Sequence, residues 1–154
     1  MVNKYAIQDF NKELMAKALG RSLPISTKQS IEICNFLRSK TTLKAKKQLE
    51  LVIKKKLAIP FKRFNKDIAH RKGNIASGKF PEKASKHFLK LIENAEKNAQ
   101  NKNLDTTTLL IKHICAHKAS TPWHFGRHRR RKMKRTHVEI VVEEIKQKKE
   151  DKRW

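Results

Sequence analysis

A dense cluster of cations lies between two strand-like segments near the carboxyl end of the chain. Seven of the nine residues from Arg127 to Arg135 are Lys or Arg, and the flanking segments at 109–116 and 138–143 are rich in Leu, Ile and Val. This order predicts a β-hairpin with an almost entirely cationic tip. Such a tip repels itself, so we expect it to be ordered only against a dense array of negative charge, which nucleic acid phosphates supply.

The excess of positive charge extends along the whole chain. The sequence holds 38 Lys and Arg against 14 Asp and Glu in 154 residues, a net charge of +24. A charge of this size is typical of proteins that bind nucleic acid or an anionic surface. The length suits one domain with a modest core. Because only 38% of the residues are hydrophobic, a low share for a globular domain, we expect a partner that neutralises charge to add stability.

Apolar residues at helical spacing predict three helices. The first begins at Ser26, which has capping-box spacing to Gln29, and fades near Lys40. The second is capped by Thr42 and stopped by Pro60, and a short strand is expected within 19–25. The third begins with Pro81 in its first position and ends at a left-handed Asn103. The buried faces of the three helices are expected to carry Ile31, Cys34 and Leu37; Ala45, Leu49, Val52 or Ile53, and Leu57; and Ala84, Phe88, Leu91, Ala95 and Ala99.

A long loop at 61–80, with Gly73 and Gly78 as breakers, interleaves aromatic and cationic residues. Loops of this length in compact domains usually bind something or are disordered. Phosphate contacts from Lys and Arg with base stacking from Phe fit RNA. For the rings of Phe61 and Phe64 a second interpretation, filling the core beneath the loop, is equally favoured.

Metal and thiol chemistry are weakly indicated. Cys34 and Cys115 lack metal-ligand spacing and a disulfide framework, which favours buried, reduced thiols of an intracellular protein. His113, Cys115 and His117 alternate, so they share one face of a strand. A metal site there needs a fourth ligand from His137 or Glu139 across the hairpin, and no motif supports one, so we favour solvated or RNA-facing histidines.

The search for catalytic motifs indicates no enzyme. The sequence contains no P-loop, dinucleotide-binding turn or Ser-His-Asp order. The acidic residues near the tip, among them Glu139 and Glu143, are expected to pair with Lys112 or Lys118. We therefore expect no cofactor and no metal. Since the first residues carry no apolar signal region and no apolar run approaches membrane-spanning length, we expect a cytoplasmic protein without membrane insertion.

Several segments resemble a known protein family. They match, in order from about Tyr5 to Ile145, the large-subunit ribosomal protein whose hairpin lines the nascent-peptide exit tunnel. This is the universal family numbered twenty-two in bacteria and seventeen in eukaryotes, and the likeness is to its archaeal branch. The matching segments are 19–21, 59–66, 70–73, 78–81, 91–99, 104–105, 113–118, 125–127 and 138–144.

The resemblance implies an α+β fold, with three helices packed on a small antiparallel sheet and a long protruding β-hairpin. We expect a single domain at 1–154: a body at 5–108 with the hairpin base, a basic hairpin at 109–145, and a charged tail at 146–154. The implied function is that of a structural constituent of the large ribosomal subunit that binds and organises its rRNA. The implied partners are rRNA, neighbouring ribosomal proteins and, at the hairpin tip, the nascent chain. A non-ribosomal basic nucleic-acid-binding protein is the alternative.

We expect rRNA contacts from the long loop, the hairpin base and the tip. The candidate residues are Arg21, Lys62, Arg63, Phe64, Asn65, Lys66, His70, Arg71, Lys72, Lys79, His117, Lys118, Trp123, Phe125, Arg127, His128, Arg129, Arg130, Arg131, Lys132, Lys134 and Arg135. The chain departs from the family pattern at 119–124, where the first arm of the hairpin is shorter than usual. There we favour stacking of Trp123 or Phe125 on RNA over a small clasp of the two rings.

Overall fold

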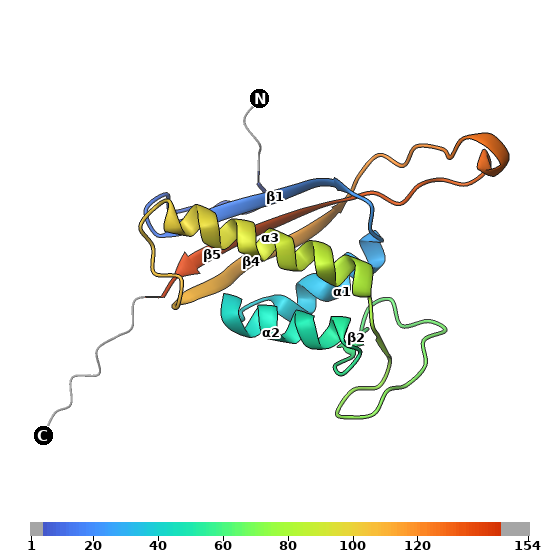
Figure 1. Ribbon diagram of the computed structural model, residues 1–154, viewed down its shortest axis with the longest axis horizontal. Coiled ribbons are helices and arrows are strands. Elements are labelled where there is room, and N and C mark those ends of the chain that lie inside the picture. Colours follow the sequence, from blue (N-terminus) through green and yellow to red (C-terminus); the bar gives the residue numbers. More distant parts are fainter. Residues whose placement is uncertain (1–4, 146–154) are drawn as a thin grey trace, which may run out of the picture.

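The computed structural model describes residues 5–145, which form an α+β fold (Figure 1). A three-stranded antiparallel sheet has the order β1-β5-β4, and a second sheet pairs β2 with β3. In chain order the elements are β1 Met15–Leu23, α1 Thr27–Leu37, α2 Thr42–Ile53, β2 Ile59–Pro60, β3 Gly78–Lys79, α3 Glu82–Gln100, β4 Leu109–Lys118 and β5 Thr136–Glu144. The expected fold class is confirmed. The proposed tail at 146–154 lies outside the described residues.

The core lies between the larger sheet and the helices. The central strand β5 alternates in side-chain direction, and its residues Val138, Ile140 and Val142 belong to the main apolar cluster. In the sheet Ile140 is paired with Ala18 of β1 and Ile114 of β4, which extends the cluster over both neighbouring strands. Helix α3 packs along β1 and β5, while α1 packs on β4 (Figure 1).

The predicted face of α3 is confirmed. Its five stripe residues from Ala84 to Ala99 are all buried, as expected for apolar residues spaced three and four apart. After the helix ends, Asn103 adopts a left-handed conformation with φ of 58°. The amide of Leu104 then donates to the carbonyl of Ala99 at 3.1 Å, which satisfies one of the free carbonyls at the helix end.

The ends of α2 differ from the sequence prediction. Thr41, not Thr42, is the cap, and its hydroxyl accepts from the amide of Lys44 at 3.4 Å. The helix ends at Ile53, well before Pro60, because Lys55 turns the chain with φ of 59°. Leu57 therefore packs on the core from a turn, and Pro60 lies in β2.

Ser26 is the N-cap of α1, as predicted, but its side chain makes no capping bond in the described structure. Two further boundaries differ. Pro81 is the N-cap of α3 rather than its first helical residue. Strand β1 begins at Met15 rather than Leu19, since Met15 and Ala16 are paired with Glu143 and Val142 of the long central strand. This pairing depends on residues far away in sequence, so the local pattern did not predict it.

The predicted hairpin is confirmed and extends beyond the body (Figure 1). Regular pairing of β4 with β5 ends at Lys118 and Thr136. The two arms then remain joined by an isolated bridge between Trp123 and Lys132, and a short 3₁₀ turn at Gly126–His128 closes the tip. The cations of the tip therefore lie apart from the cations of the body.

Candidate nucleic-acid interface

The predicted cations are exposed in two regions, the long loop and the hairpin. In the loop, the Lys and Arg side chains at 62, 63, 66, 71 and 72 are exposed, and in the hairpin those at 118, 127, 129–132 and 134 are exposed. Arg135 is half-buried. Among residues 5–145, the ion pairs found include none of these exposed cations, so their charges remain available to phosphate and their exposure fits the predicted role.

The base of the hairpin is fixed to the start of α1 by hydroxyl groups. The hydroxyls of Thr27 and Thr136 lie 2.9 Å apart, and Thr136 donates to the carbonyl of Ile25 at 2.9 Å. This junction forms one side of a hollow of about 590 Å³. We call it the groove; it is lined by Ser26, Thr27, Lys28, Ile31, Phe64, Lys118, Thr121, Lys132, Met133, Lys134 and Arg135.

The long loop is held against α1 by a buried carboxylate. Glu32 is 1% exposed, and its oxygens accept from the amides of Lys62 at 3.3 Å, Arg63 at 2.8 Å and Phe64 at 2.8 Å. Three amide donors compensate the cost of burying this charge. The first residues of the basic loop therefore have a defined conformation without any RNA.

The two rings of the loop have different environments. Phe61 is 4% exposed and belongs to the core, so core filling explains it. Phe64 is half-buried and lines both the groove and an adjacent hollow of about 370 Å³. Lys28 and Arg63 lie near its ring, with Lys28 Nζ 5.7 Å and Arg63 Cζ 5.3 Å from the ring centre. Phe64 therefore presents an aromatic surface among cations.

The farther part of the loop is a small hairpin that uses one of its own cations. His70 is bridged to Ser77, and β2 is paired with β3 at its base. Arg71 Nε donates to the carbonyl of Gly78 at 3.2 Å, and its guanidinium carbon lies 5.3 Å from the centre of the Phe80 ring. Arg71 thus orders the loop in addition to adding charge.

The structure brings only some of the predicted residues together. Lys118, Lys132, Lys134 and Arg135 line the groove with Phe64, and Arg63, Lys66 and Lys79 line the adjacent hollow. The residues from Arg127 to Arg131 lie apart at the tip. Arg21, at the end of β1, lines neither hollow, and His117 is hydrogen-bonded to Glu139.

The aromatic residues near the tip are exposed. Phe125 is 86% exposed and Trp123 is 58% exposed. The Lys132 ammonium lies 4.6 Å from the centre of the Trp123 ring. Among the described residues no Trp123–Phe125 ring pair is found. The Trp123 ring therefore contacts the Lys132 ammonium rather than the Phe125 ring.

Sequence reasoning missed Ser26, Lys28 and Met133, which also line the groove. One signal was available for Lys28. It lies in the first turn of α1, which contains no acidic residue, although the N-terminal end of a helix favours negative charge. The first turn of α2 shows the same pattern with Lys44, so this signal alone does not identify an anion site.

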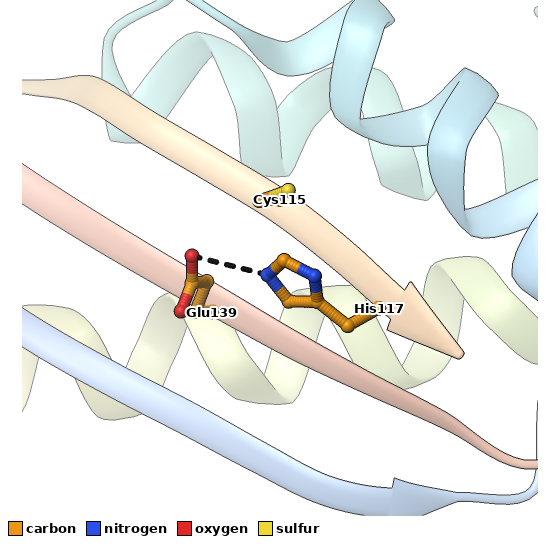
Figure 2. A group of neighbouring side chains, drawn as sticks. All are labelled: Cys115, His117 and Glu139. Atoms are coloured by element: carbon orange, nitrogen blue, oxygen red, sulfur yellow. Dashed lines mark hydrogen bonds and ion pairs between the residues drawn. The ribbon is translucent and has the colours of Figure 1, made fainter. Parts of the chain in front are cut away.

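A second cluster joins the hairpin to the N-terminal segment. Glu139 is 3% exposed and accepts from the Ala6 amide at 3.1 Å, while His113 Nε2 and His117 Nε2 lie 2.9 and 3.3 Å from its Oε1. Figure 2 shows His117 and Glu139 facing each other, with Cys115 on the strand of His117. The expectation that the two histidines share a face is confirmed. The expected pairing of Glu139 with a lysine is wrong.

The reason for that difference is a bulge in β4. The register shifts between Ile111 and His113, so His113 rather than Lys112 reaches Glu139. Lys112 instead pairs with Glu143 at 2.8 Å, as expected. Donor atoms of Cys115, His117 and Glu139 lie within 4.8 Å of one another. Each contact with Glu139 has the geometry of an ordinary hydrogen bond. We therefore interpret this cluster as a hydrogen-bonded contact that holds the N-terminal segment, through the Ala6 amide, against the hairpin.

Glu139 should therefore make the stability of the protein depend on pH. Burial raises its pKa, but hydrogen bonds from His113, the Ala6 amide and His117 outweigh this effect and hold the pKa below its ordinary value. A carboxyl with a lowered pKa stabilises the folded state above its unfolded pKa of about 4.3, and this stability is lost as the pH falls through the folded pKa.

Replacing Glu139 with Gln is expected to lower the free energy of unfolding at pH 7 by about 1–3 kcal/mol, as for other hydrogen bonds to a charged group. Denaturant unfolding of both proteins at several pH values measures the difference. It should shrink as the pH falls below about 4.3 and through the lowered pKa of Glu139 in the folded state, where the wild-type carboxylate becomes protonated. A constant difference would contradict this account, and a loss of wild-type stability on adding EDTA would instead assign the cluster a metal ion.

Replacing Glu32 with Ala is expected to loosen the basic loop, because three amides lose their acceptor. The free energy of unfolding should fall by about 2–3 kcal/mol, and the amides at 62–64 should exchange hydrogen faster. Hydrogen-exchange mass spectrometry checks both effects. Glu50→Ala is the matched control, since Glu50 is exposed on α2 and its loss changes the net charge equally. Equal exchange in the two variants would contradict the role of Glu32.

The two thiols also differ from each other. Cys34 is 2% exposed, and burial raises its pKa well above the ordinary value. Cys115 is half-buried, and burial followed by the nearby Glu139 raises its pKa too. Both are free thiols. Since a raised pKa lowers the thiolate fraction, neither has the character of a reactive nucleophile.

Comparison with known proteins places the chain in a family. Among its described residues, no helix is long and apolar enough to cross a membrane. A family model described as "Ribosomal protein L22p/L17e" matches residues 18–143. "Large ribosomal subunit protein uL22" of Methanosphaera stadtmanae is 43% identical over 92% of this chain and 97% of its own length. The proteins of the same name from Archaeoglobus fulgidus and Nanoarchaeum equitans are 42% and 43% identical, over 90% and 87% of this chain and 94% and 81% of their own lengths. The chain therefore belongs to the ribosomal protein L22p/L17e family.

Proposed function

We propose that this protein is a structural constituent of the large ribosomal subunit that binds and organises large-subunit rRNA. The observation that carries the proposal is the exposed set of cations on the loop at 61–72, at the hairpin base and at the tip. The similar proteins are named as proteins of the large ribosomal subunit, and this supports large-subunit rRNA as the nucleic acid that is bound. The role is one of binding, without catalysis, as expected for this family.

In this proposal the body and the hairpin have different tasks. The body at 5–108, with the hairpin base, anchors the protein on rRNA through the groove and the long loop. The hairpin at 109–145 reaches toward the wall of the peptide exit tunnel, where its tip meets rRNA and the nascent chain. The extension of the tip beyond the body supports this division (Figure 1).

Sedimentation tests the proposal directly. Tagged protein expressed in an archaeal host, or mixed with subunits lacking their own copy, should migrate with large subunits and remain there after a high-salt wash. The alternative, a non-ribosomal nucleic-acid-binding protein, shares the electrostatics but not the preference for the subunit. Recovery in light fractions, or equal recovery with small subunits, would contradict the ribosomal role.

Trp123 provides a test of where the tip lies. Its exposed ring is expected to stack on an rRNA base near the tunnel wall, so Trp123→Ala should raise the chemical reactivity of nucleotides around the tunnel constriction. Chemical footprinting of large subunits that carry the variant measures this. Phe36→Ala is the control, because Phe36 also lies beside a lysine, with Lys40 Nζ 3.4 Å from its ring centre, but belongs to α1. Unchanged reactivity would show that the tip ends short of the constriction.

A further inference from the structure

The groove combines an apolar wall with a cationic rim. Its volume of about 590 Å³ lies within the roughly 300–1,000 Å³ typical of small-molecule sites. The wall is formed by Ile31, Phe64 and Met133, and every charged residue in its lining is a Lys or Arg. Such a lining suits a ligand that is flat and apolar in one part and negatively charged in another.

The groove is held in place from two sides before any ligand binds. The Thr27–Thr136 contact of 2.9 Å fixes the hairpin base to α1. The bond of 2.8 Å from the Phe64 amide to the buried Glu32 fixes the aromatic wall. A site with a defined conformation in the free protein loses less entropy on binding, which favours a specific contact over loose charge attraction.

An RNA nucleotide meets the chemistry of both parts. Its base offers a π-face to an aromatic ring, and its phosphate is attracted to lysine and arginine. Base edges also need hydrogen-bond partners. The hydroxyl of Ser26, which makes no capping bond to α1 in the described structure, and that of Thr121 lie in the lining and can each donate or accept.

We propose that the groove receives the base of one unpaired RNA nucleotide, stacked on Phe64 beside Met133, with its phosphates bound by Lys28, Lys118, Lys134 and Arg135. This inference rests on the proposed function and adds to it a contact with the base of an RNA nucleotide. The adjacent hollow shares Phe64, Lys28 and Lys134 with the groove. We therefore expect the next nucleotide of the RNA to lie in the second hollow, near Arg63 and Lys79.

The decisive comparison is between RNA with and without bases. One probe is a single-stranded RNA of roughly ten nucleotides that cannot pair with itself. The other is a ribose-phosphate chain of the same length without bases. Both carry the same phosphates, so charge attraction alone gives equal affinity. We expect the full-length protein to bind the RNA about five- to ten-fold more tightly, as measured by fluorescence anisotropy, because base stacking on an aromatic ring contributes an effect of this order.

Phe64→Leu is expected to reduce that preference, and any remainder comes from stacking on the exposed Trp123 ring at the tip. It should lower RNA affinity about five- to ten-fold and leave affinity for the base-free chain unchanged. Phe36→Leu is the matched control, since Phe36 is also half-buried beside a lysine but lines neither hollow, and it should retain the preference. Thermal unfolding checks that each variant is folded. If Phe64→Leu is unfolded, Met133→Gln takes its place with the same expectation.

Equal loss of affinity for both probes, or no loss for either, would overturn the base site. The proposed function fails under a different result. Wild-type protein that neither binds RNA nor stays with large subunits after the salt wash would contradict that function itself. Protein that stays with the subunits but binds both probes equally would contradict only the nucleotide in the groove.

Discussion

Replacing Arg129, Arg130 and Arg131 with Ala is expected to flatten the salt dependence of binding to large-subunit rRNA fragments. These arginines are exposed at the tip, where bound phosphates displace counterions. Each neutralised phosphate contributes about −0.7 to −0.9 to the slope of log affinity against log salt, so the slope should change by roughly two to three units. Filter binding or anisotropy over a salt series measures the slope. Affinity at low salt should also fall steeply.

The matched control removes the same charge elsewhere. Lys44, Lys47 and Lys54 are exposed on or just after α2 and line neither the groove nor the adjacent hollow. Their replacement with Ala should leave the slope nearly unchanged, although the net charge falls equally. Equal slopes for the two triple variants would mean that the tip arginines are merely solvated and that total charge governs binding.

Leu91→Asp is expected to prevent stable folding of the body. Leu91 is 6% exposed on the buried face of α3, and an unpaired carboxylate there should lower the free energy of unfolding by about 3–5 kcal/mol. Soluble yield and thermal unfolding measure the loss. Leu43→Asp is the control, because Leu43 is 47% exposed and the same substitution there should change stability little. Normal folding of the Leu91 variant would contradict the packing of α3 on the sheet.

The sequence predicted those parts of the fold that depend on local pattern. The stripe on α3 follows from helical periodicity, and the β4–β5 hairpin follows from two apolar runs on either side of the cations; both were confirmed. The end of α2 was not predicted correctly, because Lys55 adopts a left-handed conformation that residue preference does not indicate. The start of β1 depends on pairing with Glu143 and Val142, which is a tertiary effect.

The candidate interface shows a similar limit. Composition located the loop and the tip, since runs of cations are visible in sequence. It did not separate Phe61 in the core from Phe64 at the groove, because two aromatic residues three positions apart carry the same local signal. The role of Glu32 depends on its position opposite three loop amides. Lys28 and Met133 join the groove only through the contact of α1 with the hairpin base.

The most direct test of the RNA-binding surface is ultraviolet crosslinking of purified large subunits that contain this protein. Mass spectrometry then identifies the peptides joined to rRNA. We predict crosslinks within 61–72, at the hairpin base near Met133 and at the tip near Trp123, with few on the outer face of α2. Crosslinks concentrated on α2, with none in the loop or hairpin, would contradict the proposed interface.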